Sequence, residues 1–215
     1  MTVNEDLFNR GVRHAMLLEG LKDAEVARIA KFLGGDFRKD ILARYMSAPI
    51  GQASGLRYES LLDDIKRMSR GAMRTIEKDV VQTLNEVGGL SVSFAGDSLS
   101  EALPFAYNPS MPGPNMIRAL VANEPVQGKL VTTWFKDLGQ TMGSRVNQQI
   151  TLGLTQGESV DQIIRRIRGT RAGRYMDGVI GATRRDVEAV VRTQMTHISN
   201  KARERVYEAN GEVIK

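Results

Sequence analysis

Residues 159–169 read SVDQIIRRIRG, a stretch that combines a helix start, an apolar periodicity and a helix end. A serine followed three residues later by a glutamine is a capping box, so a helix is expected to begin at Ser159. Apolar residues recur at i, i+3, i+4 and i+7, which places them on one helical face. They are Val160, Ile163, Ile164 and Ile167. Gly169 ends the pattern, because glycine is favoured just beyond the last helical residue.

A second and longer amphipathic pattern follows. Thr183 and Asp186 have the spacing of a helix start, and Gly211 stands where a helix would end. A helix over 184–210 would be about 40 Å long at ~1.5 Å per residue. The residues that share its apolar stripe are Val187, Val190, Val191, Ile198, Ala202 and Val206. Joined by the fourteen residues 169–182, the two patterns predict a helical hairpin. A DNA-reading helix-turn-helix needs a turn of about three or four residues and is therefore disfavoured.

Upstream, the sequence predicts further helices separated by glycine and proline signals. Their expected ranges are about 4–19, 23–33, 36–45, 59–87, 115–123 and 129–152. The expected breaks are Gly20, Gly34-Gly35, a loop at 47–55, and Gly88-Gly89. The segment 59–87 predicts an ordinary bundle helix. A parallel coiled coil is the alternative, but the charges flanking its apolar seam are not ordered as a coiled coil requires. Alternating serines at 90–94 predict a short strand.

Residues 104–114 interrupt regular structure, because four prolines stand in these eleven residues. This segment is predicted to be a linker between an N-terminal helical region, 1–103, and a C-terminal helical domain, 115–215. Aromatic residues make up only 6% of the chain, which suits long helices better than a compact sheet. The predicted fold class is therefore all-α: an elongated bundle of long helices with a C-terminal helical hairpin.

Positive charge is concentrated in one segment. The net charge of the chain is +5, and residues 165–185 hold seven arginines, no lysine and one acid, Asp177. The arginines are Arg165, Arg166, Arg168, Arg171, Arg174, Arg184 and Arg185. Arginine pairs in a bidentate manner with phosphate or carboxylate, so the cluster predicts contact with DNA or with an acidic protein partner. The alternative is a solubilising surface with local pairs to Asp161, Asp177 or Asp186. With only Tyr175 interleaved, DNA contact would run through phosphates without sequence preference.

The sequence offers no constellation for catalysis. Around Lys129, Asn123 and Leu130 stand where a phosphate-binding P-loop needs glycine and Ser or Thr. His14 and His197 fall in separate predicted elements, and the chain has no cysteine for a thiolate site. We therefore expect a non-enzymatic protein without cofactor or metal. No apolar run approaches the ~18 residues of a membrane span, so no membrane is required. A reducing compartment is the expectation.

The long C-terminal helix carries polar residues whose positions are informative. At 100° per residue, Gln194 falls inside the apolar stripe, and a buried amide without partners costs about 1–3 kcal/mol. Gln194 is therefore predicted to pair with polar groups of helix 159–168 or with a neighbouring subunit, and so to pin the helix packing. Arg192 falls on the opposite face. The other polar positions singled out are Thr193, His197 and Asn200.

The order of these features resembles the C-terminal core of the Mu F-type phage head morphogenesis proteins, also called minor head or minor capsid proteins. The resemblance covers about 148–215. Its residues are Gly157-Glu158-Ser159 before an apolar helix, the basic linker, Val191-Arg192-Thr193-Gln194, Asn200-Lys201-Ala202-Arg203 and Tyr207. Gln194 stands where the family usually has Glu. The chain ends at Lys215, before a strand region that usually follows, so the resemblance implies either a short member or a processed or truncated one.

The resemblance implies a structural virion protein: a minor head protein associated with the portal vertex and acting in head assembly, DNA packaging or ejection. Its partners would be the portal protein, other head proteins and packaged duplex DNA, with multiple copies per virion. It would lie in the capsid interior or at the portal vertex, and in the host cytoplasm during assembly. The alternative is a free, sequence-independent DNA-binding protein that acts through the arginine cluster.

Overall fold

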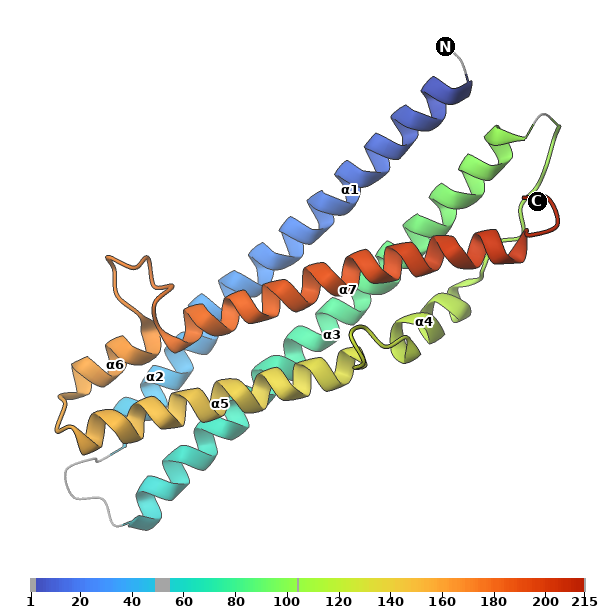
Figure 1. Ribbon diagram of the computed structural model, residues 1–215. Coiled ribbons are helices and arrows are strands. Elements are labelled where there is room, and N and C mark those ends of the chain that lie inside the picture. The colour runs from blue at the N-terminus through green and yellow to red at the C-terminus, as the bar shows by residue number, and fades with distance from the viewer. Residues whose placement is uncertain (1–2, 49–54, 104, 215) are drawn as a thin grey trace. The chain divides into compact units, whose positions relative to one another are not determined.

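The computed structural model describes residues 3–48, 55–103 and 105–214 (Figure 1). Within these ranges the chain is all-α and contains no β-strand, which confirms the predicted fold class. The elements are α1 (Val3–Phe32), the π-helical turn η1 (Leu33–Phe37), α2 (Arg38–Met46), α3 (Gly55–Ala102), α4 (Pro114–Asn123), α5 (Val131–Thr155), α6 (Val160–Arg168) and α7 (Val179–Ala209). None of the described helices is long and apolar enough to cross a membrane. Most of the predicted loop at 47–55 lies outside the described residues.

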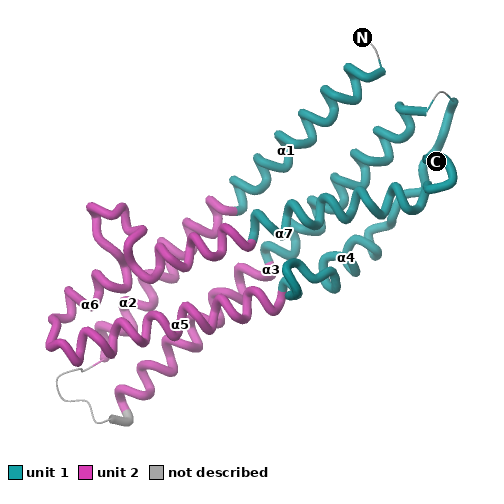
Figure 2. The backbone as a smooth tube through the Cα atoms, in the orientation of Figure 1, with its two compact units in different colours: residues 1–25, 79–131, 191–215 teal, residues 26–78, 132–190 magenta. Residues whose placement is uncertain are grey.

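The chain forms two compact units (Figure 2). Unit 1 comprises residues 1–25, 79–131 and 191–215, and unit 2 comprises 26–78 and 132–190. Helices α1, α3 and α7 contribute residues to both units. Each unit also draws residues from both sides of the 104–114 segment. That 1–103 and 115–215 are separate domains stays a prediction.

Unit 1 packs apolar faces of α3, α4 and α7 together. Fully or nearly fully buried residues include Leu84, Val87, Ala95, Val121, Ala202 and Val206. A buried hydrogen bond of 2.8 Å joins the hydroxyls of Ser91 on α3 and Ser199 on α7. Asn210, just past α7, accepts hydrogen bonds from the Tyr107 hydroxyl and the Ser110 amide at 2.7 and 2.8 Å. These bonds fasten the irregular segment after α3 to the end of α7.

Unit 2 has its own core. Its fully buried large side chains include Leu33, Ile41, Tyr45, Ile65, Phe135, Met142, Ile163 and Ile167. Two glycines one turn apart let α5 approach α3 closely. A Cβ on Gly139 would lie 3.1 Å from the Arg70 Cα, and one on Gly143 would lie 3.0 Å from the Lys66 Cα. The predicted capping box of α6 is confirmed, since Ser159 and Gln162 each bond the other's backbone amide.

Two predicted helix breaks near the N-terminus are wrong. α1 runs through Gly20, and the chain stays helical through Gly34-Gly35, which form part of η1. A single helical glycine costs only about 1 kcal/mol relative to alanine, which packing of the neighbouring apolar residues offsets. Phe37, Ile41 and Tyr45 are buried as their spacing predicts.

The predicted helix end at Gly88-Gly89 and the predicted strand at 90–94 are also wrong, because α3 continues to Ala102. Gly88 is buried, and a Cβ there would lie 2.6 Å from the Ile117 Cγ2 of α4. This glycine therefore serves close packing rather than termination. The serines remain compatible with a helix because their hydroxyls bond carbonyls one turn back, as Ser98 bonds Phe94 at 2.7 Å.

Smaller corrections concern helix starts. α7 begins at Val179 rather than near Thr183, which is buried inside the helix, so the connection from α6 spans only 169–178. The helix expected at 115–123 is α4, which begins one residue earlier, with Gly113 as its N-cap and Pro114 in its first turn. The helix expected at 129–152 is α5, which begins two residues later. Its buried residues include Val131, Phe135, Met142, Val146 and Ile150.

Candidate anion-binding site

The loop 169–178 between α6 and α7 is held together by its single acid. The Asp177 carboxylate accepts hydrogen bonds from the Thr170 amide at 2.8 Å and from the Thr170 hydroxyl at 2.6 Å. The Thr170 hydroxyl oxygen accepts a bond from the Gly173 amide at 3.0 Å. The ends of the loop touch, because a Cβ on Gly178 would collide with the backbone of Gly169. These contacts give the loop a defined shape.

The same hydrogen bonds hold Asp177 ionised. Donation by the Thr170 hydroxyl is the main cause that lowers the pKa of the Asp177 carboxyl, and the Thr170 amide acts in the same direction. The only carboxylate of the 165–185 segment is therefore engaged within its own loop. It is not among the residues that line the cavity described next.

Two successive residues of the loop have left-handed backbone. Arg174 has φ of 49° and Tyr175 has φ of 60°, although neither is glycine. Non-glycine residues rarely adopt this region, which costs about 1 kcal/mol or more and occurs often at ligand sites. The Tyr175 amide bonds the Thr170 carbonyl at 2.8 Å, which helps to fix this turn. As a result, Arg174 and Tyr175 both line one cavity.

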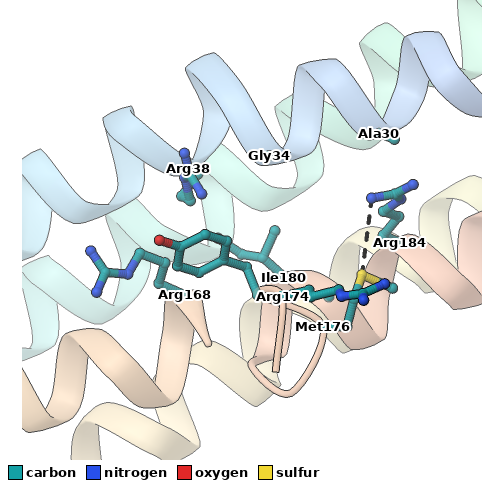
Figure 3. Close-up of a pocket in the computed structure, with 10 residues that line it drawn as sticks. Ala30, Gly34, Arg38, Arg168, Arg174, Met176, Ile180 and Arg184 are labelled. Carbon is teal, nitrogen blue, oxygen red and sulfur yellow. Dashed lines mark hydrogen bonds between the residues drawn. The ribbon is translucent and has the colours of Figure 1, made fainter. Parts of the chain in front are cut away.

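This cavity measures about 150 Å³ and lies within unit 2 (Figure 3). Four arginines from four parts of the chain line it: Arg38 of α2, Arg168 at the end of α6, Arg174 of the loop and Arg184 of α7. The remaining lining residues are Ala30, Gly34, Tyr175, Met176, Ile180 and Gly181. No acidic residue is among them. We refer to this site as the arginine pocket.

Carboxylates of the described chain do not balance the positive charge of these four guanidinium groups. None of them forms an ion pair with a carboxylate of the described chain. Arg38 and Arg168 lie over the Tyr175 ring, with their Cζ atoms 5.5 and 5.6 Å from its centroid. The buried Nε atoms of Arg168 and Arg184 have no hydrogen-bond partner in the described chain. Arg184 reaches only the Met176 sulfur, a weak acceptor, at 3.9 Å. The pocket can therefore offer several donors to an external anion.

The other arginines of the predicted cluster have different surroundings. Arg166 is a structural residue, because its Nε bonds the Glu158 carboxylate at 2.6 Å and its Nη2 bonds Gln156 at 2.8 Å. The Arg166 guanidinium lowers the pKa of Glu158 through that hydrogen bond. Arg185 donates to the Met176 carbonyl at 2.6 Å, while Arg165 and Arg171 are exposed. The alternative of a solubilising surface names Asp161, Asp177 or Asp186 as local partners, whereas the acid that pairs with Arg166 is Glu158.

The polar residues predicted on the long helix belong to unit 1, not to the arginine pocket. Arg192 pairs with Asp23 of α1 at 2.7 Å, and His197 Nε2 lies 3.5 Å from the Glu124 carboxylate. Thr193 is exposed. Asn200 accepts a hydrogen bond from Arg203. Arg192 therefore fastens α7 to α1.

Gln194 is only 2% exposed, as its place in the apolar stripe predicts. Its Nε2, however, has no hydrogen-bond partner in the described chain, so the predicted pairing of its amide is not found for this atom. The residues beside it in the stripe, Val191, Met195 and Ile198, are buried and apolar and offer no strong side-chain acceptor. The amide therefore gives this packing no hydrogen bond through its nitrogen.

Arg38 was not among the predicted site residues, because it lies about 130 positions before Arg168. Its immediate surroundings, Asp36 to Lys39, have the composition of an ordinary helical surface. Only the tertiary fold shows that Arg38 joins the cluster. Within the described ranges, no group of three or more histidines and carboxylates could hold a metal ion. In the comparisons with known proteins, no family model, no curated protein and no solved structure matches this chain.

Proposed function

We propose that this chain is a non-enzymatic structural protein of a phage head, of the minor head class, whose arginines contact the phosphates of packaged duplex DNA. The protein class rests on the resemblance over 148–215. The DNA contact rests on one observation, that four arginines line one pocket whose described lining has no carboxylate. Arginines that only stabilise a fold have carboxylate or carbonyl partners, as Arg166 has. Arginines without such partners favour an external anion.

The arginine pocket would not act alone. Arg165 and Arg171 are exposed on the same α6–loop segment and add positive charge to its surface. Binding of duplex DNA through phosphates releases condensed counterions, which supplies affinity without reading the base sequence. In this proposal the protein lies at the portal vertex or in the capsid interior. Its partners there are the portal protein and other head proteins, and it is present in several copies.

The DNA contact is tested by the salt dependence of binding to a duplex of mixed sequence. If about six phosphates are contacted, the plot of log K against log salt concentration should have a slope of about −5. Arg165→Gln combined with Arg171→Gln should bring the slope nearer to zero by about one for each phosphate that is no longer neutralised. Arg205→Gln is the matched control, because Arg205 pairs with Glu208 in unit 1. A wild-type slope near zero would exclude DNA binding.

The structural role is tested by mass spectrometry of purified virions of the source phage, before and after DNA release. A fixed low copy number supports a minor head protein. Retention after release would place it on the portal or shell, and loss with the DNA would make it an ejected protein. Presence only in assembling heads would indicate an assembly factor. Absence from both virions and assembling heads would contradict the proposal and leave the free DNA-binding protein, which the same pocket supports.

A further inference from the structure

We infer that the arginine pocket is a binding site for one phosphate group, carried either by a phosphodiester backbone or by a small phosphate compound. The inference rests on the proposed function only where it takes DNA as the source of the phosphate. The recognition itself follows from the chemistry and the size of the pocket.

The charge of the pocket favours an anion as its ligand. Arginine stays protonated at every physiological pH, so the four guanidinium groups around about 150 Å³ repel one another. Neither an ion pair with a described carboxylate nor a lining acid offsets that repulsion. A bound dianion or phosphodiester would offset it. The planar guanidinium fork matches phosphate oxygens in bidentate geometry, which favours phosphate over a spherical anion such as chloride.

The size of the pocket limits the ligand to one compact group. Sites for drug-sized ligands occupy about 300–1,000 Å³, well above the volume of this pocket, which is about 150 Å³. The space is enough for several waters and hence for a tetrahedral oxyanion. Ala30 and Gly34 form part of the wall with no side chain larger than a methyl group. A nucleoside attached to the phosphate would have to remain outside the pocket.

The donors are positioned before any ligand binds. Tyr175 lies near both Arg38 and Arg168, and cation–π attraction of this kind restrains the two side chains. Tyr175 itself is set by the left-handed turn and by its amide bond to Thr170. Side chains already ordered lose less entropy on binding.

The test is isothermal titration of the full chain with inorganic phosphate, at constant ionic strength with chloride as the background anion. Saturable binding with one site is expected. Arg38→Gln should weaken it about ten- to hundredfold, the range for losing a charged hydrogen bond. The phosphate affinity of Arg38→Lys should lie between those of the wild type and Arg38→Gln, because lysine keeps the positive charge but lacks the planar guanidinium fork. Lys39→Gln removes the same charge from the neighbouring residue, outside the pocket, and should leave phosphate binding unchanged.

Circular dichroism melting curves show whether each variant is folded, and a folded Arg38→Gln is required for the comparison. If Arg38→Gln does not fold, Arg184→Gln takes its place with the same expectation. No saturable phosphate binding, or equal weakening by Arg38→Gln and Lys39→Gln, would overturn the inference. Neither result depends on DNA. Failure of the phosphate test can therefore be distinguished from failure of the salt-slope test of the proposed function.

The source of the phosphate is decided by competition. If duplex DNA displaces phosphate, and Arg38→Gln weakens DNA binding while Lys39→Gln does so less, the pocket receives a backbone phosphodiester. If inorganic phosphate binds while the salt slope of DNA binding is near zero, the phosphate site is supported and its ligand is a small phosphate compound. DNA binding that neither displaces phosphate nor responds to Arg38→Gln would overturn the role of the pocket in DNA contact.

Discussion

At the scale of single residues, Asp177 and Gln194 show how differently two polar side chains are accommodated. Asp177 receives two hydrogen bonds from Thr170 and organises the loop that carries Arg174 and Tyr175. Gln194 is buried in an apolar stripe, and its amide nitrogen has no partner in the described chain. The first residue shapes the candidate site, whereas the second adds a desolvation cost to the packing of unit 1. Replacing Asp177 should therefore loosen its loop, whereas replacing Gln194 by an apolar residue should stabilise the chain.

We predict that Asp177→Asn loosens the loop 169–178. The ionised carboxylate accepts two bonds from Thr170, and an amide with one acceptor oxygen cannot replace both. Hydrogen exchange of the Thr170 and Gly173 amides should become faster, while exchange in α5 stays unchanged as a control. Equal exchange rates in the two proteins would contradict this role for Asp177.

The same hydrogen bonds have a defined pH dependence. Because the pKa of Asp177 is lower in the folded chain than the ordinary value of 3.8, their contribution is complete above that value. It is lost as the pH falls through the folded pKa, when the carboxylate is protonated. Slow exchange of the Thr170 amide, corrected for intrinsic rates, should therefore persist from neutral pH down to the ordinary value of 3.8 and disappear only below it. In Asp177→Asn this acid transition should be missing.

For Gln194 we predict that substitution by methionine, which has a similar length, stabilises the isolated chain. Removing a buried donor without a partner relieves a penalty of about 1–3 kcal/mol, from which small packing losses are subtracted. The free energy of unfolding in urea should rise by about 1 kcal/mol. Gln149→Met on α5, where the amide oxygen accepts from Arg166 at 3.3 Å, should not raise it. A loss of stability in Gln194→Met would mean that this amide has a partner in solution.

At the scale of elements, glycine has two distinct roles in these helices. Gly88 is buried where α3 passes α4, while Gly89 is exposed with no atom within 4 Å of an added Cβ. Gly139 and Gly143 repeat the first role between α5 and α3. In a sequence, paired glycines indicate a helix end because glycine commonly follows a helix. Packing decides between the two roles, since burial of the residues beyond Gly88 outweighs the propensity cost.

The adjacent pair allows a matched test of these roles. Gly89→Ala should stabilise the chain by about 0.5–1 kcal/mol, because alanine restricts the unfolded state and fills open space. Gly88→Ala should destabilise it by about 1–3 kcal/mol, because its Cβ would lie 2.6 Å from the Ile117 Cγ2. Thermal unfolding of both variants measures the difference. Equal shifts would contradict the packing role of Gly88.

At the scale of the whole molecule, the two units share three helices. α1, α3 and α7 are continuous from one unit into the other, so unfolding one unit alone would require opening each of them in mid-helix. The units are also interleaved in sequence, since each contains parts of the chain before and after 104–114. Few local openings can separate such units, which favours a cooperative transition.

We therefore predict a single unfolding transition in urea. Trp134, the only tryptophan of the chain, lies in unit 2 and reports that unit by fluorescence. Far-UV circular dichroism reports the helices of both units. The two midpoints should coincide, as two-state behaviour requires. Separate midpoints would show that unit 1 and unit 2 unfold independently.

The sequence by itself determined the all-α class, the capping box of α6 with its buried Ile163, Ile164 and Ile167, most of the apolar stripe of α7, and the concentration of arginine at 165–185. These features depend on contacts between residues a few positions apart, so periodicity and capping chemistry predict them. Only the tertiary structure decided that α3 passes through Gly88-Gly89, that Arg166 pairs with Glu158, and that Arg38 joins the arginine pocket. Each depends on which distant backbone or side chain comes close, and no local pattern records that proximity. The left-handed turn at Arg174 and Tyr175 could not be predicted for a similar reason. Glycine would indicate a positive φ in the sequence, whereas arginine and tyrosine do not.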